Sequence, residues 1–361
     1  MKQNIFHLFV DWWLMAPVIF LVIISLVTLL SLSQALFLNQ LFTLSLAVIA
    51  FVVFSKMRLE RLKTISLPLY IVSVIILAVV LIIGIESKGA VRWIYIFGFS
   101  FQFSELLKPF LAFASTAFLA SNTNTSFRTY ILSFVLLAPV FLLIAFQPDL
   151  GNAMIYALVT LFVFFIYGYP LIWFVLSGLP FVIASPFLWH FLHDYQRRRL
   201  MTFINPTSDP LGASYNVIQA MIAVGSGMFM GKGLSQGTQS GLRFLPERHT
   251  DFIFATISEG IGFVGAFIIV ACFIALCFRI IVMIREVDDT FTKIFGFFTF
   301  GFIMMHFFIN IGMNIGLVPI VGVTLPFVSY GGNSLLSNFI FLGIFSNLYI
   351  SHRKRHVLEI K

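Results

Sequence analysis

The feature that most constrains this chain is a series of apolar runs, each long enough to cross a lipid bilayer. A membrane-spanning helix needs about 20 apolar residues, and an α-helix satisfies its own backbone hydrogen bonds in lipid. The sequence therefore predicts one all-α polytopic membrane domain over residues 1–361. It has about ten spans, near residues 13–31, 35–54, 66–85, 104–120, 129–146, 152–168, 171–192, 252–278, 294–314 and 334–350.

The composition excludes an ordinary soluble domain. Hydrophobic residues make up 60% of the chain and charged residues 10%, and the mean hydropathy is +1.02. Soluble proteins carry about 25% charged residues, and a globule this apolar would expose large hydrophobic patches to water. Lipid is therefore the expected solvent.

The basic residues indicate how the spans are oriented, because short cytoplasmic loops are enriched in Lys and Arg. Three connections, 31–34, 147–152 and 317–333, contain no basic residue, and the alternate connections and both termini hold thirteen. Both termini are therefore predicted to be cytoplasmic. Orientation explains much of the net charge of +8, so no nucleic acid partner is expected. The thirteen are Lys2, Lys56, Arg58, Arg61, Lys63, Arg128, Arg279, Arg285, Lys293, Arg353, Lys354, Arg355 and Lys361.

The nine remaining basic residues and eight of the fourteen acidic residues fall on the predicted extracytoplasmic side. Both signs concentrate there in a chain otherwise short of charge, and ionisable groups at a membrane are costly enough to indicate function. We therefore expect a polar site on this face. Its residues are Lys88, Arg92, Lys108, Arg197, Arg198, Arg199, Lys232, Arg243 and Arg248, with Glu86, Glu105, Asp149, Asp194, Asp209, Glu247, Asp251 and Glu259.

The longest connection, 193–250, follows the seventh run. Its apolar stretch 215–224 is too short to span and predicts an interfacial or re-entrant helix. Six glycines follow between 225 and 241. They either let the chain turn at the interface or bring N–H groups, together with Lys232, to a phosphate. The spacing does not fit a P-loop, and both readings stay open.

Asp251 closes the segment Leu-Pro-Glu-Arg-His-Thr-Asp directly before the eighth run. A helix N-cap is the simple interpretation. The alternative is a general base, because a carboxylate at the mouth of an apolar helix has its pKa raised by desolvation. The crowding of Glu247, Arg248 and His249 beside it favours the second interpretation, with His249 as the rival base.

Other candidate site residues lie near the ends of the runs. Glu105 and Lys108 are three residues apart and can pair on a helix face. Asp149 has the position of a helix cap. Arg197, Arg198 and Arg199 are either interface anchors or ligands of a pyrophosphate. The uncharged segment 316–334 is predicted to form a wall of the site, with Ser329 and Tyr330 as its polar groups, because irregular apolar backbone must be buried or line a cavity.

Six spaced motifs together resemble the SEDS family (shape, elongation, division and sporulation), and the resemblance covers nearly the whole chain. The Glu-Arg-His-Thr-Asp form of one motif, and the separate segment Asp-Tyr-Gln-Arg (194–197), look closer to the rod-shape branch than to the division branch. The motifs are Lys-Gly-Ala-Val-Arg-Trp-Ile (88–94), Phe-Gln-Phe-Ser-Glu-Leu-Leu-Lys (101–108), Gln-Pro-Asp-Leu-Gly (147–151), Gly-Lys-Gly-Leu with Gly-Thr-Gln (231–239), Pro-Glu-Arg-His-Thr-Asp-Phe-Ile-Phe (246–254) and Leu-Pro-Phe-Val-Ser-Tyr-Gly-Gly (325–332).

The resemblance implies a multi-pass protein of the bacterial plasma membrane that polymerises lipid II into glycan strands during cell elongation. It implies a class B penicillin-binding protein as transpeptidase partner, with other elongation-complex proteins. Asp251 matches the family's essential catalytic aspartate, and Glu105, Lys108 and Arg92 match its other motif residues. Three departures, Phe103, Gly260 and Arg243, leave the roles of Glu259 and Arg243 open.

The expected reaction is an inverting glycosyl transfer with Asp251 as general base. The leaving undecaprenyl pyrophosphate needs positive charge, for which Arg92, Lys108, Arg197, Arg199 and Lys232 are candidates. A divalent cation, Mg²⁺ or Mn²⁺, is an open question at this stage. A lipid II transporter and a scaffold without turnover are the alternatives.

Overall fold

The computed structural model describes residues 11–58, 63–87, 90–96, 99–122, 124–192, 194–205, 214–241 and 244–359. Several charges that the sequence assigned to one face or the other lie outside these residues, namely Lys2, Arg61, Lys88, Asp209, Arg243 and Lys361.

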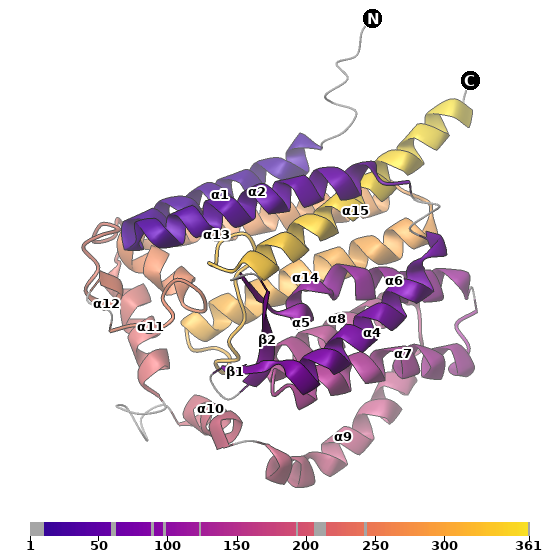
Figure 1. Cartoon of the computed structure of the whole chain (residues 1–361), viewed down its shortest axis with the longest axis horizontal. Helices are drawn as coiled ribbons and strands as arrows, with labels where there is room; N and C mark the ends of the chain where they lie inside the picture. Colours follow the sequence, from indigo (N-terminus) through magenta and orange to yellow (C-terminus); the bar gives the residue numbers. More distant parts are fainter. Residues whose placement is uncertain are drawn as a thin grey trace, which may run out of the picture.

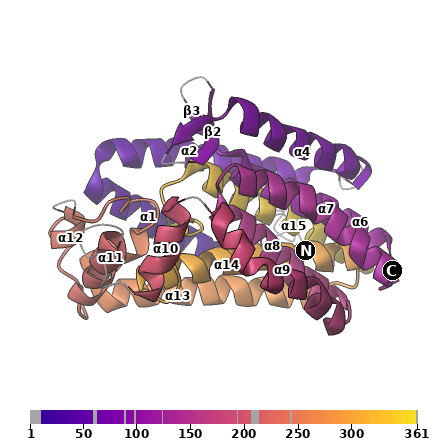
Figure 2. The same ribbon diagram turned by 90° about the horizontal axis from the view of Figure 1, so that it is seen from below.

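The described chain folds into a bundle of long helices with a small sheet at its edge (Figures 1 and 2). In chain order the elements are α1 (Trp12–Leu32), α2 (Gln34–Lys56), α4 (Ser66–Ile83), β1 (Ile85–Ser87), β2 (Ala90–Ile96), β3 (Phe99–Phe101), α5 (Phe103–Leu106), α6 (Lys108–Ser121), α7 (Phe127–Phe146), α8 (Leu150–Tyr167), α9 (Leu171–Phe191), α10 (Asp194–Ile204), α11 (Tyr215–Ser226), α12 (Thr238–Gly241), α13 (Ile253–Arg285), α14 (Thr290–Asn314) and α15 (Gly332–Glu359).

Eight helices of the described residues are long and apolar enough to cross a membrane: α1, α2, α4, α7, α8, α13, α14 and α15. This confirms an all-α polytopic membrane protein. The other two runs of the sequence are also helical but differ from the expectation. Residues 104–120 form α5 and then the 14-residue α6, and the helix restarts where Pro109 occupies its first turn. Helix α9 contains Pro180 and Pro186.

The structure contains a three-stranded antiparallel sheet, with strand order β1-β2-β3, which the sequence analysis did not predict. Its central strand, Ala-Val-Arg-Trp-Ile-Tyr-Ile, is rich in the β-branched and aromatic residues that favour strands and is too short to span. The register pairs Tyr95 with Ser100. The Ser100 carbonyl accepts a hydrogen bond of 3.0 Å from Asn333 Nδ2 of α15, which joins the sheet to the bundle.

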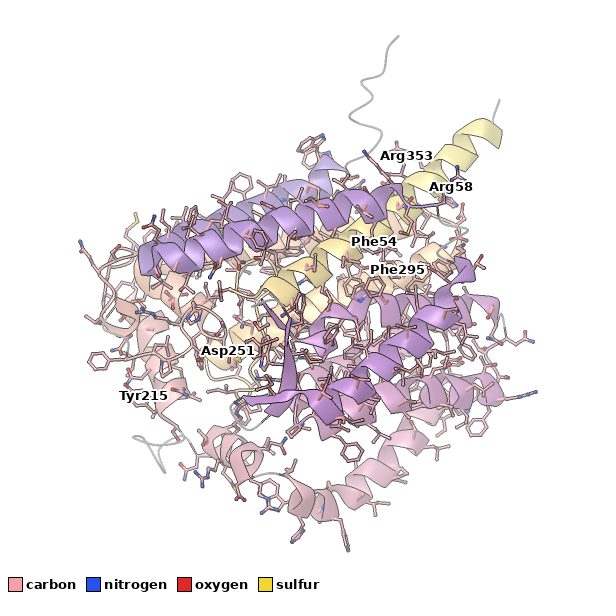
Figure 3. All side chains as sticks on the ribbon, in the orientation of Figure 1. Phe54, Arg58, Tyr215, Asp251, Phe295 and Arg353 are labelled. Carbon is pink, nitrogen blue, oxygen red and sulfur yellow. The ribbon has the colours of Figure 1, made fainter. Side chains whose placement is uncertain are left out.

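Two basic residues of the predicted cytoplasmic set lie at the opposite end of the bundle from Asp251. Figure 3 shows Arg58 and Arg353 at one end, and Asp251 and Tyr215 toward the other. These two basic residues of the predicted cytoplasmic set therefore lie together at one end. Which end faces the cytoplasm stays a prediction.

The centre of the bundle is held by α15, which packs against α2, α14 and α6 (Figure 1). A Cβ at Gly343 would lie 2.9 Å from the Phe51 carbonyl oxygen, so the small residue lets α15 and α2 approach closely. Asn347 of α15 donates to the carbonyls of Phe54 and Met57, at 2.9 and 2.7 Å, where α2 ends.

Helix α13 is broken at Gly262, which has φ of 76° and ψ of −162°, a conformation restricted to glycine. The glycine-rich segment 228–233 replaces the missing helical hydrogen bonds. A Cβ on Gly231 would lie 2.3 Å from the Gly260 carbonyl oxygen, so close backbone approach explains this glycine. The four bonds run from Lys232 N to Glu259 O, Gly233 N to Gly260 O, Phe263 N to Met228 O and Val264 N to Phe229 O.

Candidate active site

Asp251 lies in a turn two residues before α13 and is half-buried. Phe252, not Asp251, is the N-cap residue of α13, so the capping interpretation of Asp251 is wrong. The point at which a Cβ would stand on Gly322 is 3.5 Å from Asp251 Oδ2 and 3.8 Å from Arg199 Nη1. The fold therefore brings the aspartate and an arginine of the 193–250 connection to the same glycine.

The segment 325–331 packs against the turn that contains Asp251. Ser329 Oγ donates to the Thr250 carbonyl at 2.7 Å and accepts from Leu325 N at 2.8 Å. Tyr330 N donates to the His249 carbonyl at 2.8 Å, and the two rings lie 5.5 Å apart. Ser329 thus connects the 325–331 segment to the turn that contains Asp251. The 316–334 segment lies beside the site, as the sequence predicted.

Glu247 belongs to the same turn and has φ of 52°. Its carboxylate accepts a hydrogen bond of 3.0 Å from Thr250 Oγ1, and its carbonyl accepts from Thr250 N and Phe252 N. Glu247 therefore shapes the turn that presents Asp251.

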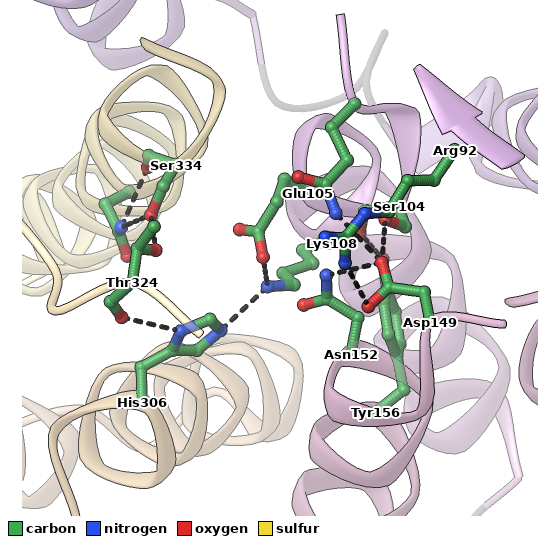
Figure 4. A network of polar contacts seen from close by, with 12 residues as sticks. Arg92, Ser104, Glu105, Lys108, Asp149, Asn152, Tyr156, His306, Thr324 and Ser334 are labelled. Carbon is green, nitrogen blue, oxygen red and sulfur yellow. Dashed lines mark hydrogen bonds and ion pairs between the residues drawn. The ribbon is translucent and has the colours of Figure 1, made fainter. Parts of the chain in front are cut away.

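A second group of polar residues centres on Asp149, which is buried at the start of α8 (Figure 4). Arg92 Nη1 lies 3.2 Å from one carboxylate oxygen. The other oxygen accepts hydrogen bonds at 2.8 to 3.1 Å from Gln102, Ser104 and Asn152. Asp149 occupies the predicted cap position, but its side chain makes no capping bond and turns to these partners instead.

The partners of Asp149 decide its charge. Burial alone would raise the pKa of Asp149, but Arg92 and the three hydrogen-bond donors outweigh burial and lower it. Asp149 is therefore ionised at neutral pH and neutralises Arg92. Two buried atoms beside it, Arg92 Nε and Asn152 Oδ1, have no hydrogen-bond partner among the described residues, so a bound polar group or water can pair with them.

A third group joins Glu105, Lys108 and His306 (Figure 4). Lys108 Nζ is 2.7 Å from Glu105 Oε1, which confirms the predicted pair, and 2.7 Å from His306 Nε2. His306 Nδ1 is 3.1 Å from the Thr324 carbonyl oxygen, so Nδ1 carries the proton and Nε2 accepts from Lys108. The cation of Lys108 is buried between two partners on opposite sides.

Glu259 and Lys232 form a separate group farther along α13. Glu259 is fully buried and accepts hydrogen bonds from α12: Gln239 N and Ser240 N at 2.9 and 2.8 Å, and two hydroxyls. Lys232 Nζ lies 3.9 Å from its carboxylate. Since the N–H groups of residues 231–233 bond to backbone carbonyls, the structure favours the turn-forming reading of the glycines over a phosphate cradle.

The three consecutive arginines of α10 have different surroundings. Arg197 donates from Nε to the Trp189 carbonyl at 2.9 Å and from Nη2 to the His190 carbonyl at 2.6 Å, so it caps the end of α9. Arg198 and Arg199 are exposed, and only Arg199 is placed near Asp251. Of the predicted pyrophosphate ligands, Arg199 therefore has the most suitable position.

Sequence reasoning missed His306, Asn310 and Asn314. These side chains recur every four residues of an apolar run and so share one face of α14, where all three are buried. That spacing of polar groups inside a span was the available signal.

The described residues do not offer a ready metal site. No three Asp, Glu, His or Cys side chains there come together in an arrangement that could hold an ion. The divalent cation left open above therefore has no such ligand set in that part of the chain, and no step below depends on one.

These features define a polytopic membrane protein with a buried ionised network and a half-buried aspartate at one end of its bundle. Residues 3–355 match the family of cell cycle proteins FtsW, RodA and SpoVE, and the chain belongs to this family. It is 42% identical over 290 residues to peptidoglycan glycosyltransferase MrdB of Escherichia coli K12, covering 79% of this chain and 78% of that protein.

Other known proteins agree with this assignment. The probable peptidoglycan glycosyltransferase FtsW of Idiomarina loihiensis is 33% identical over 293 residues, 80% of this chain and 71% of that protein. A chain of a peptidoglycan synthase complex that coordinates polymerization and crosslinking superposes with a TM-score of 0.82 at 28% identity, covering 96% of this chain and 98% of that one. The rod shape determining protein RodA of Thermus thermophilus gives a TM-score of 0.71 at 27% identity, covering 96% and 97%.

Proposed function

We propose that this protein is the peptidoglycan glycosyltransferase of cell elongation, which polymerises lipid II at the outer face of the bacterial plasma membrane. The proposal rests mainly on the position of Asp251. This residue is half-buried in a turn held by hydrogen bonds and lies beside Arg199. It lies at the end of the bundle away from Arg58 and Arg353. The names of the relatives supply the reaction class. A lipid-linked substrate explains why the chemistry is carried by a membrane protein.

In the proposed mechanism, Asp251 removes the proton from the 4-hydroxyl of the incoming lipid II sugar. That oxygen forms a bond to the anomeric carbon of the growing chain while the bond from this carbon to undecaprenyl pyrophosphate breaks. An α-linked donor gives a β-linked product in one displacement, so a single base is sufficient. The proton remains on Asp251 until it passes to solvent.

The cations predicted to bind the pyrophosphate have unequal roles in this mechanism. Arg92 and Lys108 are engaged with buried carboxylates, and Arg197 caps a helix. Arg199 lies beside the aspartate and is exposed. It therefore supplies positive charge to the leaving pyrophosphate, which a guanidinium binds through two parallel hydrogen bonds.

We also propose a class B penicillin-binding protein as the partner. The similarity to a chain of a peptidoglycan synthase complex supports this proposal. A transpeptidase in the same assembly would crosslink the strands as they are polymerised.

The test is polymerisation of labelled lipid II by the purified protein with its partner, comparing wild type with Asp251→Asn. The matched control is Asp288→Asn, which changes an exposed carboxylate in the connection between α13 and α14, at the other end of α14 from Asn314. Polymer from wild type and the control, and none from Asp251→Asn, is the expected result. Equal polymer from Asp251→Asn would remove Asp251 from the mechanism, and no polymer from any folded protein would favour transport or scaffolding.

A further inference from the structure

Two buried asparagines of α14 contact the backbone of the aspartate rather than its carboxylate. Asn310 and Asn314 are one helical turn apart, and neither has any exposed surface. Amide side chains inside a membrane-spanning helix are costly unless every polar atom finds a partner. Their partners therefore indicate why they are there.

Both amides donate to the Asp251 carbonyl. Asn310 Nδ2 lies 3.0 Å from the Asp251 oxygen and 2.7 Å from the Val323 carbonyl oxygen. Asn314 Nδ2 lies 3.0 Å from the same Asp251 oxygen, and its Oδ1 accepts from Ala255 N at 3.1 Å. The two side chains thus connect the turn, the first helical turn of α13 and the loop that carries Gly322.

The preceding carbonyl is held as well, because Ser329 Oγ donates to Thr250 O at 2.7 Å. The carbonyls of Thr250 and Asp251 belong to the two planar peptide units on either side of the Asp251 Cα. Fixing both planes fixes φ and ψ at Asp251 and hence the direction of its Cα–Cβ bond. The backbone contacts therefore aim the carboxylate.

Asn310 also positions the loop that carries Gly322 on the other side of the Asp251 carboxylate. Because Asn310 binds Val323 as well as Asp251, it sets the distance between the aspartate and the neighbouring Gly322. An added Cβ at Gly322 would contact both the carboxylate and Arg199. The position of the substrate oxygen between base and cation depends on this spacing.

We propose that Asn310 and Asn314 are positioning residues for glycosyl transfer, which hold the Asp251 backbone so that its carboxylate points at the reacting hydroxyl. The inference rests on the proposed function, with Asp251 as the base. It predicts that loss of either amide reduces the rate of the chemical step more than the binding of lipid II, since neither side chain is exposed to substrate.

The experiment measures kcat and KM for lipid II polymerisation by the protein with its partner, together with Tm, for Asn310→Leu and Asn314→Leu. Asn347→Leu is the matched control, because Asn347 is also a buried amide that donates to two backbone carbonyls but lies where α2 ends. We expect kcat to fall about 100-fold, the usual cost of misplacing a reacting group by about 1 Å. KM should change little, and Asn347→Leu should lower Tm while keeping kcat.

Normal kcat in a folded Asn314→Leu protein, or an equal loss of kcat in Asn347→Leu, would overturn the inference. If the leucine variants do not fold, Asn310→Ser and Asn314→Ser decide in the same way, because a single serine hydroxyl cannot replace both contacts of either amide. The Asp251→Asn variant separates the two proposals. If it polymerises normally, the proposed base is wrong; if it is inactive while the asparagine variants have normal kcat, only the positioning role is wrong.

Discussion

Replacing Asp149 by alanine is expected to destabilise the protein strongly. The carboxylate accepts hydrogen bonds from Gln102, Ser104 and Asn152, all of which are buried, and pairs with Arg92. A buried donor left without a partner costs about 1–3 kcal/mol. Arg92 is one-fifth exposed, so water recovers part of its loss.

Because these losses overlap in one network, we expect the free energy of unfolding to fall by about 4 kcal/mol rather than by their full sum. The assay is reversible unfolding in mixed micelles, followed by tryptophan fluorescence. Asp288→Ala, an exposed carboxylate, is the control and should change the free energy by less than about 0.5 kcal/mol. A loss below about 1 kcal/mol for Asp149→Ala would refute the view that the network stabilises the fold.

The pH dependence provides a second check on the same residue. The pKa of Asp149 is lowered from 3.8, so the folded protein binds the proton less readily than the unfolded chain. Its stabilisation is fully present above about pH 5 and is lost as the pH falls below 3.8 through the folded pKa. The difference between wild type and Asp149→Asn should be constant from pH 7 to about 5 and shrink below 3.8. A difference that grows on acidification would contradict the assignment of charge.

Two further predictions concern the broken helix and the arginine beside the aspartate. Gly262→Ala should lower stability by about 3 kcal/mol or more, since the backbone conformation is restricted to glycine and an added Cβ would lie 2.3 Å from a backbone nitrogen. Gly225→Ala, with no atom within 4 Å, should be neutral or slightly stabilising in the same unfolding assay. Arg199→Ala should reduce kcat for lipid II polymerisation about 100-fold, as loss of a donor to developing charge does, whereas Arg198→Ala should keep it. Equal rates for these two variants would show that the position of Arg199 beside Asp251 has no catalytic consequence.

The sheet and the break in α13 are two features that the sequence patterns did not predict. The strand residues 90–96 have β propensity, but a strand forms only where a neighbour supplies hydrogen bonds, and that neighbour is a fold property. Similarly, the glycines at 227–233 are visible in the sequence, yet their partner is the backbone of α13 near Gly262, about 30 residues away. Their reading as a phosphate loop or a turn could be decided only by where their N–H groups point.

By itself, the sequence located the eight helices of the described residues that are long and apolar enough to span a membrane, and it indicated that polar residues gather at one end of the bundle. These properties depend on the transfer of each segment from water to lipid, which is local. Only the tertiary structure decided which polar groups meet: Arg92 with Asp149, Lys108 with His306 across 198 residues, and Arg199 beside Asp251. The packing of the helices decides which group comes within hydrogen-bond distance of a buried ion, and no local sequence pattern specifies that distance. The asparagines that hold Asp251 became apparent for the same reason, since they act on its backbone and not through a motif.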